Sequence, residues 1–258
     1  MNKQLEAFAQ LLKIMDELRE KCPWDSAQTF ESLRKLTIEE TYELADAILE
    51  KDLTEIKKEL GDLLLHIIFY AKIGEEKEAF TITDVIDGLN EKLIYRHPHI
   101  YGNEKAKNAR EVEENWEALK LKEKGRKKKT VLEGVPVSLP ALVKANRIQE
   151  KVSAIGFDWK QKELVWDKVK EEIQEVETEL AQKNRQATEG EFGDLFFSLV
   201  NAARLYGVDP EAALERTNKK FTNRFNFLES QTLKKGKKLR ELSLREMDRY
   251  WEEAKQNE

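Results

Sequence analysis

The sequence predicts an all-α protein built from two tandem copies of one helical-bundle unit, and three observations support this. Of the 258 residues, 37% are charged and 40% hydrophobic, with only 11 glycines and 5 prolines, a composition that favours helices. Apolar residues recur every three or four positions along most of the chain, and no stretch alternates as a strand would. One acidic motif occurs twice with identical internal spacing, which indicates an internal repeat.

Five helices are expected in the first half, at about residues 2–20, 29–50, 52–73, 81–97 and 108–124. Three of these helix starts have candidate N-cap residues, whose side chains can accept hydrogen bonds from the free N–H groups of the first turn. The candidates are Thr29 or Ser32, Asp52 or Thr54, and Thr81 or Thr83. Pro23 is expected to interrupt the helical pattern after the first helix, and the fourth helix should end before Pro98.

Residues 131–142, VLEGVPVSLPAL, are the predicted linker, because they combine several Gly and Pro residues with no helical period. They separate an N-terminal unit of residues 1–130 from a C-terminal unit of residues 143–258. From the end of the linker onward, helices are expected at about 139–152, 163–183, 186–206, 209–229 and from 243.

The acidic motif of the C-terminal unit consists of Glu171, Glu172 and Glu175, followed after sixteen residues by Glu191 and then Asp194. Spacings of three and four place such side chains on one face of a helix. The helix after the motif, LFFSLVNAARL, is too apolar for a surface, so acids at its start are costly unless a cation neutralises them. Carboxylates from two facing helices form an all-oxygen site suited to a hard divalent cation such as Mg²⁺.

The N-terminal unit contains the second copy, in which Glu39, Glu40 and Glu43 are followed by Glu59 and Asp62 at the same spacing. A single block of this kind is usually a solvated helix face. Two blocks at matched spacing, each joined to an apolar helix, favour a metal site in both units.

Basic residues accompany the acidic motifs. Lys220 and Arg224 project together from the helix after the C-terminal motif, and Lys168 lies one turn before Glu172. Lys92 and Arg96 repeat the Lys-xxx-Arg pair in the first half. Cations around a carboxylate–metal cluster are typical of a polyphosphate site.

The expected reaction is attack of water on a phosphorus centre, because no activated Ser or Cys nucleophile stands nearby. Glu171 or Glu172 is the candidate base. Trp251 or Trp159 could stack on a nucleobase. Trp251 could equally pack the last helix onto the body, since Trp116 occupies the matching position in the first copy.

Together the EExxE…ExxGD blocks, the downstream Lys-xxx-Arg pairs and the CPWD sequence at residues 22–25 resemble the MazG family of nucleoside triphosphate pyrophosphohydrolases. The resemblance covers nearly the whole chain as two MazG domains in tandem. It implies an intertwined homodimer and dependence on Mg²⁺, with Mn²⁺ as a substitute. It also implies nucleotide-pool housekeeping by cleavage of nucleoside triphosphates between the α- and β-phosphates to monophosphate and pyrophosphate.

The resemblance also implies roles for individual residues. The metal ligands would be Glu172, Glu175, Glu191 and Asp194, with a second, weaker site at Glu40, Glu43, Glu59 and Asp62. The nucleotide would be held by Lys168, Glu171, Lys220, Arg224 and Trp251, with Lys92 and Arg96 as N-terminal counterparts. Leu36 stands opposite Lys168, so the C-terminal unit is the expected main catalytic unit and the N-terminal unit is expected to bind metal and dimerise.

Bulk properties exclude several other functions. A net charge of −5 argues against a nucleic-acid binder, and no apolar run is long enough to span a membrane. The single cysteine, Cys22, indicates a reducing compartment, so a cytoplasmic location is expected. A di-iron carboxylate bundle would need Glu-x-x-His pairs, and the C-terminal half contains no histidine. A non-catalytic metal-binding interaction or regulatory module stays open as the alternative.

Overall fold

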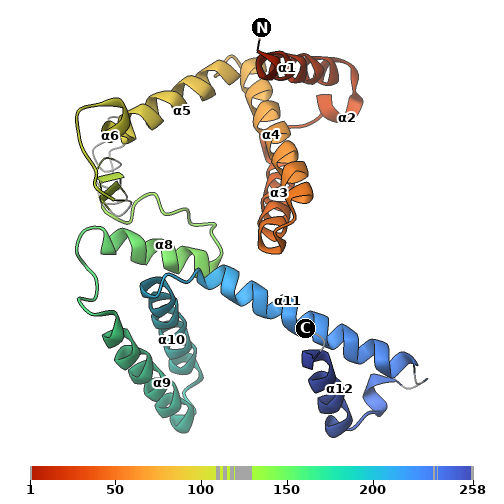
Figure 1. Ribbon diagram of the computed structural model, residues 1–258, viewed down its shortest axis with the longest axis vertical. Coiled ribbons are helices and arrows are strands. Elements are labelled where there is room, and N and C mark those ends of the chain that lie inside the picture. The colour runs from red at the N-terminus through yellow and green to blue at the C-terminus, as the bar shows by residue number, and fades with distance from the viewer. Residues whose placement is uncertain are drawn as a thin grey trace. The chain divides into compact units, whose positions relative to one another are not determined.

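The computed structural model describes residues 2–256 except 109–110, 113–114, 117–118, 120–129, 235 and 237. The described residues form helices and turns with no strand, which confirms the all-α prediction (Figure 1). The chain divides into two compact units, Met1–Trp116 and Glu117–Glu258, and each contains one copy of the acidic motif. The linker at residues 131–142 and the unit boundaries beside it stay a prediction.

The first unit contains α1 (Lys3–Lys21), α2 (Pro23–Ser26), α3 (Phe30–Glu50), α4 (Leu53–Glu76), α5 (Ile82–Arg96) and α6 (Pro98–Tyr101). Three predicted helix starts are confirmed by their caps. Thr29 forms a capping box with Ser32 at α3, and Asp52 accepts hydrogen bonds from the first N–H groups of α4. Thr81 caps α5 in the same way as Thr29 caps α3.

Two prolines begin short helices. Pro23 and Pro98 occupy the first positions of α2 and α6, where the missing N–H would have no partner within a helix. The one-turn helix at Pro23 differs from the break that the sequence predicts there. The helix expected at residues 108–124 falls partly on residues outside the described part of the chain.

The core of the first unit lies between α1, α3 and α4. Its buried members are Met15, Leu33, Ile68, Phe69 and Ile73. α4 is the most apolar of these helices because it packs against both α1 and α3. The α3–α4 pair therefore forms a fixed support for the acidic residues that both helices carry.

The second unit contains α8 (Ala141–Ser153), the 3₁₀ turn η1 (Lys162–Leu164), α9 (Val165–Gln182), α10 (Arg185–Leu205), α11 (Pro210–Lys234), the 3₁₀ turn η2 (Leu239–Glu241) and α12 (Leu244–Gln256). The α-helix bounds agree with the predicted helices to within about two residues, except that α11 continues to Lys234 where an end near 229 was expected. Val165, Val169 and Ala202 form a core between α9 and α10, whereas Leu228, Leu242 and Tyr250 form a separate core between α11 and the last helix. Figure 1 shows α11 running away from the α9–α10 pair, with α12 packed on its far part.

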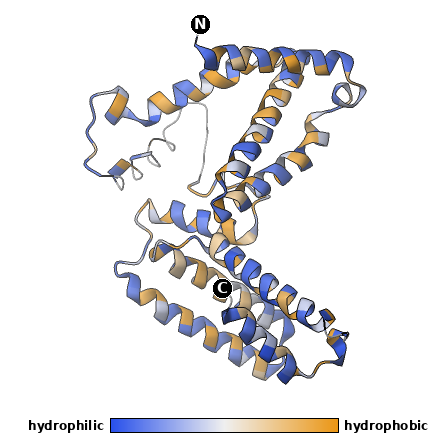
Figure 2. Cartoon of the chain, turned by 45° about the vertical axis from the view of Figure 1, so that its right-hand side comes forward, coloured by the Kyte–Doolittle hydropathy of each residue, from blue (hydrophilic) through white to orange (hydrophobic). Residues whose placement is uncertain are grey.

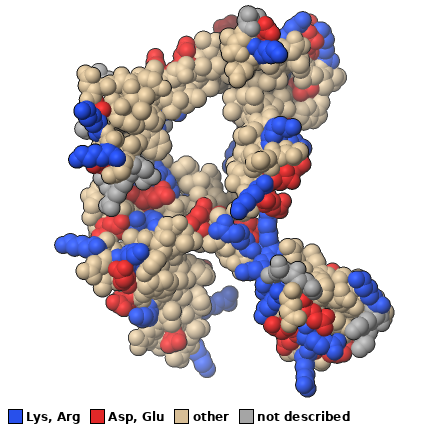
Figure 3. Space-filling view, in the orientation of Figure 1, with Lys and Arg blue, Asp and Glu red and all other residues tan. Residues whose placement is uncertain are grey.

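The surface is mixed in character. Figure 2 shows apolar residues alternating with hydrophilic ones along the helices, as expected of amphipathic elements. On the face drawn in Figure 3, acidic and basic side chains are interspersed. Among the described helices, none is both long enough and apolar enough to cross a membrane.

Candidate metal centre and nucleotide site

The α9–α10 pair brings three predicted metal ligands together. Glu172 and Glu175 on α9 and Glu191 on α10 each offer a carboxylate oxygen, and these oxygens lie within 4.8 Å of one another. Glu172 lies in the same helix stripe as Val169 and Val176, which are buried. The glutamate therefore faces α10 and is only 4% exposed.

Electrostatics show that this cluster carries unbalanced negative charge. Although Glu175 is exposed overall, local desolvation raises its pKa, and a hydrogen bond with Glu172 and the charges of Glu172 and Glu191 raise it further. Like charges at this distance disfavour full ionisation unless a cation is added. The donor set, carboxylate oxygens alone, fits a hard divalent cation such as Mg²⁺.

Lys168 is the cation nearest the buried acid. Its Nζ lies 2.7 Å from Glu172 Oε1 and 2.8 Å from Glu171 Oε1. Hydrogen bonds to Glu171 and then to Glu172 raise the pKa of Lys168 above its ordinary value. The predicted one-turn spacing between Lys168 and Glu172 is therefore a direct contact.

The first unit repeats the arrangement on α3 and α4. Oxygens of Glu40, Glu43 and Glu59 lie within 4.8 Å of one another. Burial raises the pKa of Glu40, and the charges of Asp62, Glu43 and Glu59 raise it further. Glu59 is 3% exposed, and its Oε2 is buried without a hydrogen-bond partner. An orphaned buried carboxylate oxygen is costly, so this donor set also fits a cation.

The N-terminal cluster differs from its copy in the cation beside it. Lys58 of α4 donates to Glu59 Oε1 at 2.8 Å, whereas Leu36 stands where the second unit has Lys168. Lys58 is exposed and extends from the neighbouring helix position rather than from the turn before the acidic motif. The missing lysine is visible in the sequence, whereas the contact between Lys58 and Glu59 was not predicted.

The two aspartates lie outside the three-oxygen groups. Asp194 is exposed on α10, one turn after Glu191, and Asp62 is half-buried on α4. Asp62 is near enough to Glu40 to raise the pKa of that carboxyl. Each unit thus brings three of its four predicted ligands together, and the roles of all four stay predictions.

Lys220, Arg224 and Trp251 gather on α11 and α12. The Arg224 guanidinium carbon lies 5.7 Å from the Trp251 ring centre, and the Phe221 ring lies 5.0 Å from the same ring. Lys220 is exposed one turn before Arg224. Trp251 therefore packs the last helix against α11, and the Arg224 guanidinium lies over its ring.

The N-terminal counterparts contain the same contact. The Arg96 guanidinium carbon lies 5.4 Å from the Trp116 ring centre. Arg96 is buried, whereas Lys92 is exposed on the same helix. These residues occupy equivalent positions in the two copies, but the sequence alone does not predict an Arg–Trp contact.

The acidic cluster and the Lys–Arg–Trp group lie on different helix pairs. In the described part of the second unit, α9 packs mainly on α10 and η1, while α11 packs mainly on α12 and α8. Figure 1 shows the same separation. One chain therefore does not bring all the predicted site residues of this unit together.

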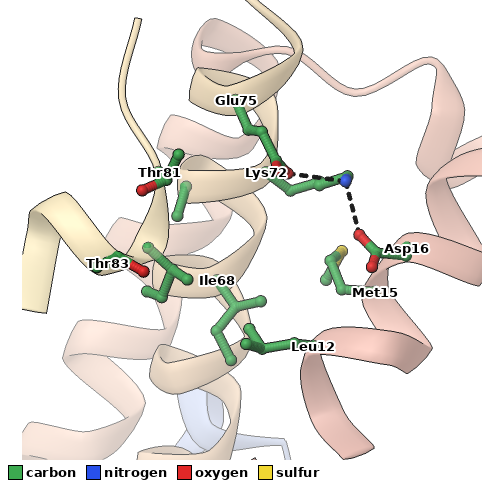
Figure 4. A pocket seen from close by; sticks show the side chains of 10 residues that line it. Leu12, Met15, Asp16, Ile68, Lys72, Glu75, Thr81 and Thr83 are labelled. Atoms are coloured by element: carbon green, nitrogen blue, oxygen red, sulfur yellow. Dashed lines mark hydrogen bonds and ion pairs between the residues drawn. The ribbon is translucent and has the colours of Figure 1, made fainter. Parts of the chain in front are cut away.

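A hollow of about 250 Å³ lies between α1, α4 and α5, apart from every predicted site residue (Figure 4). Lys72 Nζ lies 2.6 Å from Asp16 Oδ1 and 2.8 Å from Glu75 Oε2 at its edge. Leu12, Met15 and Ile68 are among the residues that form its apolar wall. Its one lysine is already neutralised by two acids.

Sequence reasoning missed two arginines that hold the tryptophan-containing loops. Arg204 donates to both carboxylate oxygens of Asp158, at 3.0 and 2.6 Å, next to Trp159. In the first unit, Arg19 donates to the backbone oxygens of Asp25 and Gln28 beside Trp24. The sequence contains two loosely similar stretches, CPWD at residues 22–25 and GFDW at residues 156–159, but it does not reveal their arginine partners.

Comparison with known families supports the repeat. The sequence model of the MazG nucleotide pyrophosphohydrolase domain matches the chain twice, over residues 28–101 and 160–227. Each matched segment contains one acidic cluster and one Lys-xxx-Arg pair.

Several curated proteins are similar to nearly the whole of this chain. A protein of Thermotoga maritima named nucleoside triphosphate pyrophosphohydrolase/pyrophosphatase MazG is 46% identical over 250 residues, covering 96% of this chain and 95% of its own. The nucleoside triphosphate pyrophosphohydrolase of Escherichia coli K12 is 40% identical over 254 residues, covering 96% and 97%. The uncharacterised YabN of Bacillus subtilis is 43% identical over 97% of this chain, which corresponds to 52% of YabN.

Proposed function

The chain belongs to the MazG nucleotide pyrophosphohydrolase family, and from this we propose which of its two units carries the main hydrolytic centre. It is a nucleoside triphosphate pyrophosphohydrolase, which cleaves its substrates between the α- and β-phosphates and serves nucleotide-pool housekeeping. In our proposal the C-terminal unit carries the main hydrolytic centre. The observation that supports it is the contact of Lys168 with Glu172 in the acidic cluster, which Leu36 makes impossible in the first unit.

Glu172, Glu175 and Glu191 would hold Mg²⁺, or Mn²⁺ in its place, with Asp194 added from the next turn of α10. Such a bound cation supplies neutralisation of the phosphate charge. The support is the crowding of carboxylate oxygens within 4.8 Å and the raised pKa of Glu175. In the first unit, Glu40, Glu43, Glu59 and Asp62 would form the weaker site.

The chain's own residues would bind the substrate and move the proton. Lys168 can exchange a carboxylate partner for a phosphate oxygen, because it already spans Glu171 and Glu172 at the edge of the cluster. Glu171 is exposed and outside the three-oxygen group, so its carboxylate is the better placed base for the attacking water. Glu172 would then act chiefly through the metal.

A second copy of the chain would complete the site. Exposed apolar residues form matching stripes, at Leu60, Leu64 and Ile67 on α4 and at Phe192, Phe196 and Leu199 on α10. Phe196 is 57% exposed, and stripes of this kind mark contact surfaces. In a homodimer, Lys220, Arg224 and Trp251 of one chain could reach the acidic cluster of the other. The cytoplasmic location expected from the sequence belongs to this proposal too.

The test is pyrophosphate release from a panel of NTPs and dNTPs with Mg²⁺. We expect Glu172→Gln to lower turnover by about 100-fold or more, because it removes a buried ligand of the cluster. Glu40→Gln is the matched control at the equivalent position of the first unit, and it should keep turnover within a few-fold.

Three outcomes would count against the proposal. Loss of turnover with Glu40→Gln alone would assign the centre to the first unit. Release of orthophosphate would indicate a different bond. No release from any nucleotide would leave the regulatory metal-binding module as the better account.

A further inference from the structure

The first unit contains a second hollow, of about 560 Å³, between α2, which carries Trp24, and the first turns of α3. Its lining includes Trp24, Gln28, Ser32, Arg34 and Lys35. The volume falls within the range of small-molecule sites, about 300–1,000 Å³. None of the residues assigned above to metal, catalysis or nucleotide binding lines it.

Trp24 is exposed on the short helix α2, whose backbone is held by several hydrogen bonds. Gln28 Nε2 donates to the Trp24 carbonyl at 2.9 Å, and Ser32 Oγ donates to Gln28 Oε1 at 2.7 Å. Arg19 fixes the same segment from inside through the carbonyls of Asp25 and Gln28. Trp24 nevertheless stays 57% exposed, so an aromatic side chain on a held backbone is available to a ligand.

Two cations of the lining are unpaired. Arg34 and Lys35 make no hydrogen bond and no ion pair with any residue that the structure describes. In contrast, Lys168 of the other unit and Lys72 beside the hollow of Figure 4 each contact two acids. Positive charge is therefore available to a ligand at Arg34 and Lys35.

One acid, Glu31, also lines the hollow. It lies in the first turn of α3, where its own backbone N–H and then the Thr29 side chain lower the pKa of its carboxyl. The helix start thus stabilises this negative charge. Arg34 and Lys35 together outweigh it, and the lining favours an anion.

We propose that this hollow is a separate binding site for a nucleoside monophosphate, with the base stacked on Trp24 and the phosphate held by Arg34 and Lys35. Arginine suits the phosphate geometry, and an indole face accepts any base. Ser32 and Leu36 line the hollow on the helix face that continues to Glu40. The site supplies the first unit with phosphate-binding cations in place of the missing lysine, and it does not depend on the proposed hydrolysis.

Calorimetric titration of the full chain with AMP, GMP, CMP and UMP, in buffer with EDTA, tests the inference. We expect at least one to bind. The double variant Arg34→Glu/Lys35→Glu should weaken binding at least 10-fold, and Trp24→Ala should do the same, while Trp24→Phe keeps it within a few-fold. The control Lys57→Glu reverses an exposed, unpaired charge on α4 and should change nothing.

Binding should survive in Lys220→Ala/Arg224→Ala, which lacks two of the cations assigned to nucleotide binding in the second unit. The inference is overturned if no monophosphate binds the wild type, if the double variant binds as well as the wild type, or if Lys220→Ala/Arg224→Ala loses all binding. A changed oligomeric state of the double variant would instead identify the hollow as a subunit contact. Pyrophosphate release by the same variants is measured separately, so a failed inference leaves the hydrolytic function standing.

Discussion

The contact between Arg204 and Asp158 determines the conformation of the loop before α9. Ser153 Oγ donates to the same carboxylate at 2.6 Å, and the Trp159 backbone N–H donates to it at 2.8 Å. Burial by itself raises the pKa of Asp158, but the hydrogen bonds from Arg204 and Ser153 outweigh it and lower the pKa below its usual value. The carboxylate is thus stabilised in its ionised form.

Asp158→Asn should therefore lower the free energy of unfolding at pH 7 by about 2 kcal/mol, because charged hydrogen bonds are lost. Because the pKa of Asp158 is lower in the folded state, the carboxylate stabilises the fold above the pKa of the unfolded state, near pH 4. This stabilisation is lost as the pH falls through the pKa of the folded state. The difference between wild type and variant in urea unfolding should therefore shrink below about pH 4.

Asp167→Asn is the matched control, because Asp167 and Lys170 form an ion pair in which both side chains are more than 70% exposed. It should cost less than about 1 kcal/mol at any pH. A difference for Asp158→Asn that stays constant down to pH 2 would show that the charge of Asp158 contributes nothing.

Spacing along a helix predicts some side-chain contacts and not others. The pair Lys168–Glu172 was readable because residues four apart share a helix face. Arg204 and Asp158 are 46 residues apart, so their contact depends on the packing of α10 against the preceding loop. The unpaired state of Arg34 and Lys35 is equally a property of the folded unit.

At the level of elements, the α3–α4 pair and the α9–α10 pair have the same backbone conformation in the turns that join their helices. Lys51 directly follows α3 and Lys183 directly follows α9, and both have φ 58°, in the left-handed region. Asp52 and Asn184 then cap the next helices. The repeat therefore includes the backbone path that sets the angle between the helices and brings the acids together.

Lys51→Gly and Lys183→Gly should each stabilise the protein by up to about 1 kcal/mol, because glycine adopts this conformation without strain. Thermal unfolding measures the effect. Lys57→Gly, in the interior of α4, should instead destabilise by about 1 kcal/mol. Destabilisation at both turns would mean that the two lysines make contacts that outweigh their strained backbone.

Helix positions were predictable because apolar periodicity and capping residues agree, as at Thr29 and Asp52. The one-turn helices at Pro23 and Pro98 were not, since a proline marks a break and a helix start equally well. Their formation depends on the packing of the loops around them.

For the whole molecule, the proposed homodimer would explain both the repeated apolar stripes and the separation of the predicted site residues. Each unit leaves its stripe exposed, at Leu64 on α4 and at Phe196 on α10. The Lys–Arg–Trp group of the second unit lies on α11 and α12, away from the cluster on α9 and α10. The roles of these residues stay a prediction from the sequence. The sequence could not show that they lie on separate helix pairs within one chain.

The central claim is that the acidic cluster of one chain and the α11 cations of another form a single phosphate-cleaving centre. Its most direct test is pyrophosphate release by a heterodimer of Glu172→Gln and Lys220→Ala/Arg224→Ala chains, co-expressed with two tags. Each variant alone should be nearly inactive. In a symmetric dimer the heterodimer should keep one intact centre and about half of wild-type turnover. A heterodimer no more active than its parents would contradict the account.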